Sequence, residues 1–185
     1  MIKSDILNQL QTLWKLSDWA VMVSRKVLTL VLVTRPNQVL LGMKKRGFGE
    51  GWWNGFGGKV EKGETIIEAA KRELQEECCL TANTLTEVGQ LDFEFVGDPQ
   101  ILEVHLFTTK DVSGVPTETS EMKPQWFDID KIPFHKMWPD DKLWFPHVLK
   151  GSKFSAFFLF EGHHKILKHK IDVVTEQSHI DSEVK

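Results

Sequence analysis

The segment at residues 58–80 restricts this chain more than any other, because a glycine turn there leads into a helix rich in carboxylates. Its apolar spacing predicts a helix over about residues 65–78. With about 100° between successive residues, Glu73, Glu76 and Glu77 fall within an arc of about 100°. The neighbouring apolar stripe contains Ile67, Ala70, Leu74 and Cys78. A carboxylate cluster beside the core stripe favours the wall of a cleft over a solvated face.

Such a cluster suits a divalent metal. Neighbouring carboxylates repel one another and raise each other's pKa, so a hard cation that takes their oxygens stabilises them. Mg²⁺ prefers carboxylate and phosphate oxygens and keeps several waters. A charge run on a helix usually marks only a solvated face, but the adjoining glycine turn favours a metal site against a phosphate chain. We therefore expect Mg²⁺ as the cofactor, with Mn²⁺ as the alternative.

The rest of the chain predicts a single α+β domain. Its 185 residues fit one core, and 41% hydrophobic with 26% charged residues is typical of a soluble globular protein. Strands are predicted at residues 27–33, 39–43, 84–96, 102–108, 125–129, 154–160 and 165–171, with a short helix after Pro139. Strands grouped around one or two helices indicate a sandwich with a mixed sheet. We expect the domain at residues 25–172, an N-terminal extension with helical spacing at 1–24, and a polar tail at 173–185.

Charge and cysteine content limit the partners and the location. A net charge of -3 gives no electrostatic case for binding a nucleic acid polymer, and no apolar run is long enough to span a membrane. The cysteines are the adjacent Cys78 and Cys79, which indicates a reducing compartment. We expect a monomer in the cytoplasm, with nuclear and mitochondrial pools as alternatives. Acidic residues make the N-terminal extension a weak mitochondrial address.

The same segment resembles the Nudix box, Gly-x5-Glu-x7-Arg-Glu-U-x-Glu-Glu-x-Gly-U, where U is aliphatic. The matching residues are Gly58, Glu64, Arg72, Glu73, Leu74, Glu76, Glu77 and Leu80. One position departs, because Cys79 stands where the family has glycine at the end of the helix. A residue with a side chain there costs about 1 kcal/mol or more if the backbone is left-handed, so we expect a smaller stability margin and retained activity. The resemblance implies a Nudix-type α/β/α sandwich.

Roles in the chemistry also follow from this resemblance. It implies that metal is bound by Gly57, through its carbonyl, and by Glu73, Glu76, Glu77 and Glu121. Arg72 would orient Glu73 through an ion pair, and Glu77 with its neighbours would position the attacking water. Glu121 lies outside the box, and an ordinary loop glutamate is the alternative there. The sequence does not decide which glutamate takes the proton.

Beyond the box, the chain is similar to the mammalian MutT-type hydrolases of oxidised purine nucleoside triphosphates. The likeness covers roughly residues 27–172 and includes TLVLV, VLLGMKKRGFGEGWWNGFGGKV, FEFVG, EMKPQWF and MWPDDKLWFP. It implies hydrolysis of a small-molecule nucleotide such as 8-oxo-dGTP or 2-hydroxy-dATP to the monophosphate and pyrophosphate, which removes mutagenic nucleotides from the pool. Flat surfaces for a purine would come from Phe48, Phe93, Phe95, Trp138 and Trp144, with a place in the core as the alternative for each.

Polar residues would then read the edge of the base. Two neighbouring carboxyls in an aromatic slot would not both ionise readily, so one of Asp140 and Asp141 could donate a proton while the other accepts. Capping of the following helix is their alternative role. Asn54 offers a donor and an acceptor, although an asparagine among glycines can also be a turn residue. The other substrate contacts implied by the resemblance are Thr29, Lys44, Gly57, Gly58 and Pro139.

Three other functions fit less of the sequence. A Nudix enzyme for methylated purine nucleotides, dinucleoside polyphosphates or sugar nucleotides would keep the box but need a different pocket. A nonenzymatic nucleotide-binding module would more often have lost a box glutamate. An interaction protein would have no reason to keep both the acids and the glycine turn.

Overall fold

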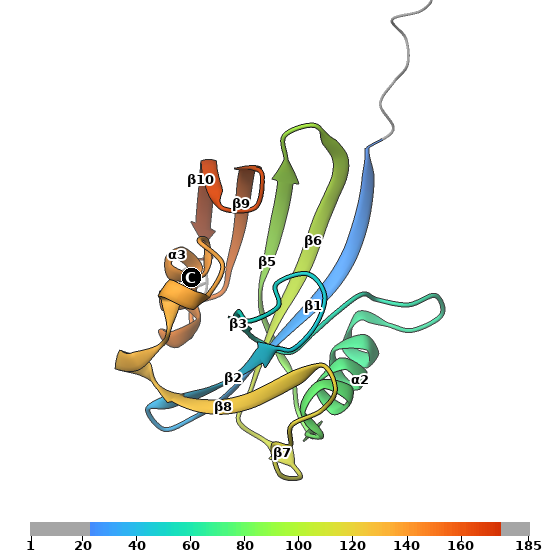
Figure 1. The fold of residues 1–185 in the computed structure, drawn as a ribbon, viewed down its shortest axis with the longest axis vertical. Coiled ribbons are helices and arrows are strands. Elements are labelled where there is room, and N and C mark those ends of the chain that lie inside the picture. Colours follow the sequence, from blue (N-terminus) through green and yellow to red (C-terminus); the bar gives the residue numbers. More distant parts are fainter. Residues whose placement is uncertain (1–22, 175–185) are drawn as a thin grey trace, which may run out of the picture.

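The structure is a computed structural model that describes residues 23–174 (Figure 1). Most of the expected N-terminal extension, residues 1–22, and most of the expected polar tail, residues 175–185, lie outside the described residues. Between residues 23 and 174, no helix has the length and apolar character needed to cross a membrane.

A mixed sheet of eight strands forms the centre of the molecule. Its strand order is β10-β9-β5-β6-β1-β2-β3. Both β1 and β3 pair with one edge of β2, and β8 pairs with the opposite edge. The strands are β1 (Ser24–Arg35), β2 (Gln38–Lys44), β3 (Trp53–Asn54), β5 (Thr86–Phe95), β6 (Asp98–Thr109), β8 (Met122–Asp128), β9 (Phe154–Glu161) and β10 (Lys165–Val173). The two-residue strands β4 (Thr81–Ala82) and β7 (Val112–Ser113) form a separate small sheet. Parallel pairs β1–β6 and β5–β9 alternate with antiparallel ones, which confirms the predicted mixed sheet.

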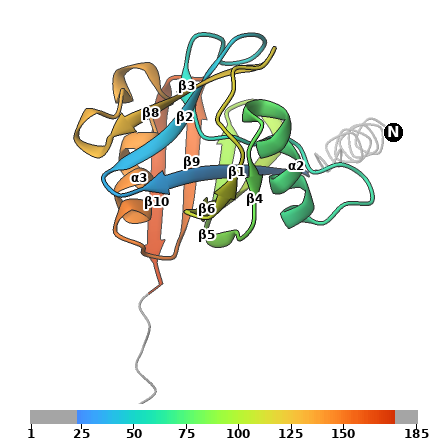
Figure 2. The ribbon, with the colours of Figure 1, turned by 90° about the horizontal axis from the view of Figure 1, so that it is seen from below.

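Two α-helices cover the sheet, α2 (Ile66–Cys78) and α3 (Asp141–Leu149), and Figures 1 and 2 show them well apart on either side of it. Short 3₁₀ helices at Ile129–Lys131 and Phe134–Lys136 lead into α3. The centre of β1 is apolar without alternation because both of its faces are buried. Leu30 and Leu32 pack in the cluster that includes α3, whereas Val31 and Val33 pack in the cluster that includes α2. The sandwich architecture expected from the sequence is therefore confirmed.

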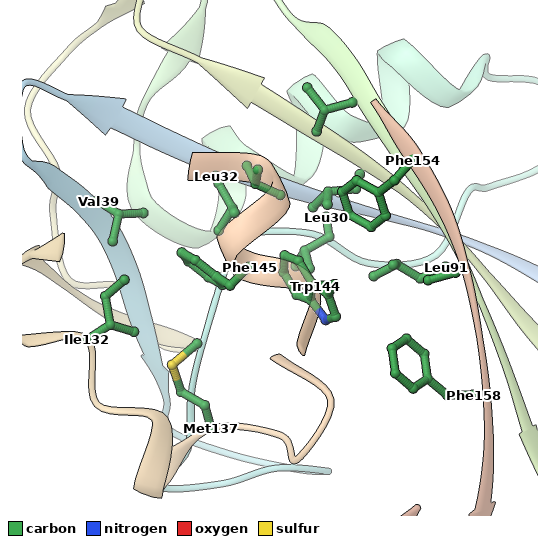
Figure 3. Packing of buried hydrophobic residues seen from close by; sticks show 14 of the residues in the cluster. Leu30, Leu32, Val39, Leu91, Ile132, Met137, Trp144, Phe145, Phe154 and Phe158 are labelled. Carbon is green, nitrogen blue, oxygen red and sulfur yellow. The ribbon is translucent and has the colours of Figure 1, made fainter. Parts of the chain in front are cut away.

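The cluster beneath α3 is the larger of the two cores. Trp144 and Phe145 of α3 are buried there among side chains of β1, β2, β5 and β9 (Figure 3). Phe158 and Leu91 belong to the same cluster, and the partly buried Phe93 packs against it. This core fixes the loop before α3 relative to the sheet, and that loop carries several of the predicted substrate contacts.

Helix α2 begins and ends where its sequence signals predicted. Thr65 caps it, accepting a hydrogen bond from the Glu68 N–H while the Glu68 carboxylate accepts one from the Thr65 N–H. Cys79 ends it with a φ of 61°, the left-handed geometry expected at this position. The prediction that Ile67 belongs to the buried stripe is wrong, since Ile67 is 50% exposed. Ile66 and Ala69 lie on the core side instead, because the buried arc of the helix is rotated toward them.

Candidate active site

The glycine turn before α2 is held directly against β1. The Thr29 N–H donates to the Gly58 carbonyl at 2.8 Å, and the Val31 N–H donates to the Phe56 carbonyl at 2.6 Å. A Cβ on Gly57 would lie 2.0 Å from the Thr29 carbonyl oxygen, and one on Gly58 would lie 2.5 Å from a Glu73 carboxylate oxygen. Glycine is therefore required at Gly57, where backbone atoms block a Cβ, whereas a side chain at Gly58 would displace the Glu73 carboxylate. The turn brings a strand, a loop and the glutamate helix together.

Glu77 is the most buried of the three clustered glutamates, with 2% of its surface exposed. Its carboxylate accepts a hydrogen bond from the Gly57 N–H at 2.8 Å. Burial raises the pKa of Glu77 to about 8, repulsion by Glu73 adds to the rise, and the charge of Lys44 opposes it. Positive charge placed near this carboxyl would favour its ionised form.

Arg72 joins the other two glutamates to the turn. Its guanidinium forms ion pairs with Glu73 at 2.9 Å, with Glu76 at 3.0 Å and with Glu64 at 2.7 Å. The predicted ion pair between Arg72 and Glu73 is thus present. Burial raises the pKa of Glu73 in spite of Arg72, whereas Glu76 is 57% exposed at its side chain. The three glutamates therefore occupy three environments on one side of α2.

Glu121 approaches the same region from the loop before β8. Its carboxylate forms an ion pair with Arg46, and its carbonyl accepts a hydrogen bond from the Lys45 N–H at 2.8 Å. Its negative charge contributes to the raised pKa of both Glu73 and Glu77. This coupling places the loop glutamate near the box glutamates, as the resemblance implied.

The carboxylates of this region are oxygen ligands of the kind that a hard cation prefers, but they do not surround a single point. Over the described part of the chain, no three His, Cys, Asp or Glu side chains are grouped closely enough to hold a metal. Arg72, Arg46 and the Gly57 N–H engage the carboxylates instead. Burial and repulsion by neighbouring carboxylates raise the pKa of both Glu73 and Glu77, and a divalent cation would relieve both effects. The residues fit such an ion, and the ligand set stays a prediction.

A cavity of about 350 Å³ opens beside the glycine turn. From the first half of the domain, the predicted contacts that line it are Thr29, Lys44, Phe48, Asn54, Gly57 and Gly58. From the second half they are Phe93, Phe95, Trp138, Asp140, Asp141 and Trp144. Pro139 is not part of the lining, and neither are the glutamates of α2. The cavity meets the glutamate helix through Gly57 and Gly58, which also contact Glu77 and Glu73.

Two buried acids lie in this cavity at the start of α3. The Asp140 carboxylate accepts a hydrogen bond from Trp144 Nε1 at 2.9 Å, and the Asp141 carboxylate accepts one from the Trp138 N–H at 2.9 Å. Burial raises the pKa of Asp140 to about 6 and that of Asp141 well above its usual value, with repulsion by Asp140 adding to the second shift. Near neutral pH the pair can hold one proton, which gives it a donor and an acceptor at once. The capping alternative fails for Asp140, whose side chain makes no capping bond.

Two smaller polar groups also face the cavity. The Thr29 hydroxyl oxygen is buried and is the one such side-chain atom between residues 23 and 174 that lacks a hydrogen-bond partner. An unpartnered hydroxyl in a cavity lining is suited to a ligand. The Asn54 side-chain oxygen accepts a hydrogen bond from the Gly55 N–H at 2.8 Å, so the turn role is real, although the side chain also lines the cavity.

The aromatic residues divide between wall and core. Phe48 stacks on Trp138 with ring centroids 4.8 Å apart, and Phe48 is 60% exposed. Trp144 is 1% exposed and packs in the core while it also lines the cavity. Phe93 also lines the cavity while it packs against the core, where its ring stacks on that of Phe158 with centroids 5.5 Å apart. For the last two, the core and wall interpretations are both correct.

Sequence reasoning missed several lining residues. They include Trp52, Leu102, Val104, Met122, Phe160 and His163. Alternation along the predicted strands could have indicated Leu102 and Val104, since Leu102 lies opposite Phe93 in the register of β5 and β6. His163 lies in a polar turn, where no local pattern distinguishes it from a solvent-exposed residue.

Comparisons with known proteins agree with this geometry. A family model of the NUDIX domain matches residues 24–148. The chain is 56% identical over 155 residues to the oxidized purine nucleoside triphosphate hydrolase of Danio rerio, which covers 84% of this chain and 99% of that protein. It is 54% identical over 150 residues to the protein of the same name from Mus musculus, covering 81% and 96%. Among solved structures, a MutT protein from Bacillus halodurans superposes with a TM-score of 0.70 at 28% identity and covers 80% of this chain and 97% of its own.

Proposed function

This chain belongs to the Nudix family, and on that premise we propose that it hydrolyses oxidised purine nucleoside triphosphates to the monophosphate and pyrophosphate. One observation carries the choice of substrate. The cavity that meets the glutamate helix at Gly57 and Gly58 is also lined by the buried pair Asp140 and Asp141. A base bound at the pair can therefore place its triphosphate at the glutamates. Removal of 8-oxo-dGTP and 2-hydroxy-dATP from the nucleotide pool is the role that follows.

The acid pair is suited to bases whose edges have changed. Oxidation alters the pattern of donors and acceptors on a purine, and a pair that shares one proton can meet more than one pattern. In our proposal one carboxyl of the pair donates and the other accepts, since burial raises the pKa of both acids and repulsion by Asp140 adds to the rise at Asp141. Asn54 adds a contact to the base, and the rings of Phe93 and Trp138 supply apolar walls.

The phosphate chain would lie along the glycine turn. Lys44 and the Thr29 hydroxyl line this part of the cavity and can contact the phosphates or the sugar. Glu73, Glu76, Glu77, Glu121 and the Gly57 carbonyl would hold the cation. When bound, Mg²⁺, or Mn²⁺ as the alternative, supplies charge neutralisation at the phosphates and a lowered pKa for water. Arg72 keeps Glu73 oriented, and the Gly57 N–H fixes the carboxylate of Glu77.

The reaction is an in-line displacement by water. Water attacks the β-phosphorus, the bond from that phosphorus to the α–β bridging oxygen breaks, and the nucleoside monophosphate leaves. The attacking water becomes part of pyrophosphate and gives up a proton. Glu77 and its neighbours position this water, and the resemblance to the family supports attack at the β-phosphorus.

A panel of nucleotides assayed with Mg²⁺ tests the proposal. Pyrophosphate release and identification of the monophosphate should show turnover of 8-oxo-dGTP and 2-hydroxy-dATP, and chelation of the metal should abolish it. Methylated purine nucleotides belong in the panel, because the same pocket could accept them. A higher kcat/KM for unmodified dGTP than for either oxidised nucleotide would refute the substrate assignment. We also propose a cytoplasmic location, which the free cysteines Cys78 and Cys79 support.

A further inference from the structure

Five aromatic rings contact one another beside the cavity. This ring cluster consists of Phe48, Trp52, Trp138, His163 and His164. Its members come from the glycine-rich loop, from the loop before α3 and from the turn between β9 and β10, at residues 162–164. The two histidines make different contacts, since His163 lines the cavity and His164 does not.

His163 bridges two walls of the slot. Its ring lies 4.9 Å from the ring of Phe48 at an interplanar angle of 74°, and 5.8 Å from the ring of Phe95 at 64°. Phe48 belongs to the glycine-rich loop and Phe95 ends β5, so the histidine joins elements that are distant in sequence. His164 instead packs on Trp52 at 5.1 Å and on Trp138 at 6.2 Å.

Phe48 needs such support. It is 60% exposed, and the glycines on either side of it, Gly47 and Gly49, have φ values of 74° and 83°. A ring on a glycine-rich loop has many alternative positions, and ordering it when ligand binds would weaken the affinity. Trp138 contacts one face of Phe48 by stacking, and His163 meets it edge-on. These two contacts hold the ring at the cavity before ligand arrives.

We propose that His163 is a positioning residue for the purine base, a role that rests on the proposed function because it assigns the base to this cavity. The imidazole contacts Phe48 and Phe95 together and so fixes the position of each ring relative to the other in the cavity lining. The turn between β9 and β10 is thereby part of the substrate site, although it lies outside the Nudix box and outside residues 24–148. His163 therefore increases the affinity for the base and does not change the rate of hydrolysis at the glutamates.

The test compares variants of the full chain that remove or keep the ring. His163→Ala and His163→Gln remove its aromatic edges, and His163→Phe keeps a ring of similar reach. His169→Ala is the matched control, because His169 stacks on Phe158 at 6.1 Å and does not line the cavity. Three quantities are measured: KM and kcat for 8-oxo-dGTP with Mg²⁺, and the Kd of 8-oxo-dGMP by tryptophan fluorescence without metal. Thermal melting checks that each variant folds.

The expected pattern is a loss of affinity alone. His163→Ala and His163→Gln should raise KM and Kd about three- to tenfold with kcat within about twofold, the size expected for lost aromatic contacts. His163→Phe should restore most of the affinity, and His169→Ala should match the wild type. Unchanged KM and Kd in the alanine and glutamine variants would overturn the inference, as would equal losses in His163→Phe or in the control. A wild-type enzyme that prefers dGTP would refute the proposed function and leave the role of His163 to be tested separately. The Kd of dGMP, compared across the same variants, would then decide that role.

Discussion

Asp140→Asn should stabilise the protein near neutral pH while it weakens recognition of the base. Asp140 is 4% exposed, and burial raises the pKa of its carboxyl from 3.8 to about 6. A shift of this size corresponds to at most about 3 kcal/mol of lost folding free energy once the carboxyl is ionised, since one pKa unit is about 1.4 kcal/mol. Asparagine keeps an oxygen that can accept the hydrogen bond from Trp144 Nε1. The substitution therefore removes the charge and keeps the contact.

The stabilisation should have a definite dependence on pH. Below pH 3.8 the carboxyl is protonated in both the folded and the unfolded state, so wild type and variant should be equally stable. As the pH rises toward about 6, the unfolded chain loses this proton while the folded protein keeps it, and only the wild type loses stability. The difference should be complete above that pH. The variant also removes the repulsion by Asp140 that helps to raise the pKa of Asp141, and this adds to the gain in stability.

Urea unfolding followed by circular dichroism at several pH values measures this difference. Asp130→Asn is the control, because Asp130 is exposed in a 3₁₀ helix and should give no comparable trend. The variant should gain little at pH 4 and most at pH 8, and its kcat/KM for 8-oxo-dGTP should fall. A variant that is less stable than wild type at pH 8, or a difference that does not change with pH, would show that burial of this charge does not govern the site.

Three other substitutions test the glutamate helix and its turn. Cys79→Gly should raise the free energy of unfolding by about 1 kcal/mol, because the backbone at Cys79 has a left-handed φ of 61°. The matched change Asn37→Gly, at a φ of 59°, should give a smaller increase, since asparagine tolerates this geometry. Equal increases for the two variants would show that strain at Cys79 does not lower the stability. Gly57→Ala should lower the free energy of unfolding by more than about 2 kcal/mol, because its Cβ would meet the Thr29 carbonyl at 2.0 Å, and an unchanged urea midpoint would disprove this. Glu77→Gln should lower kcat at least about a hundredfold, and near-normal turnover would show that Glu77 takes no part in the chemistry. It should leave the urea midpoint unchanged or higher near neutral pH, because burial raises the pKa of the Glu77 carboxyl to about 8 and glutamine removes the cost of that shift.

Local signals in the sequence predicted the elements well. The apolar spacing predicted a helix over about residues 65–78, and α2 spans Ile66–Cys78, with Thr65 as its N-cap. The β-branched run at residues 27–33 became the centre of β1 because both faces of that strand are covered. Ile67 was misplaced because a helical wheel does not say which apolar residues meet the sheet.

Features that depend on distant contacts could not be predicted in this way. The two-residue strand β3 exists because Trp53 and Asn54 pair with Met43 and Gly42, and nothing local indicates that pairing. The place of His163 at the cavity depends on the pairing of β9 with β5 and on the course of the glycine-rich loop. The burial that raises the pKa of the acid pair likewise arises only when α3 packs on the sheet.

The most direct test of the account is the ratio of kcat/KM for 8-oxo-dGTP to kcat/KM for dGTP, measured with Mg²⁺ in the wild type and in Asp140→Asn. A site that reads the altered base edge should favour the oxidised nucleotide by more than about tenfold. The ratio should fall toward one in the variant, whose carboxyl pair is broken. A wild-type ratio below one, or the same ratio in both proteins, would contradict recognition of the oxidised base by Asp140 and Asp141.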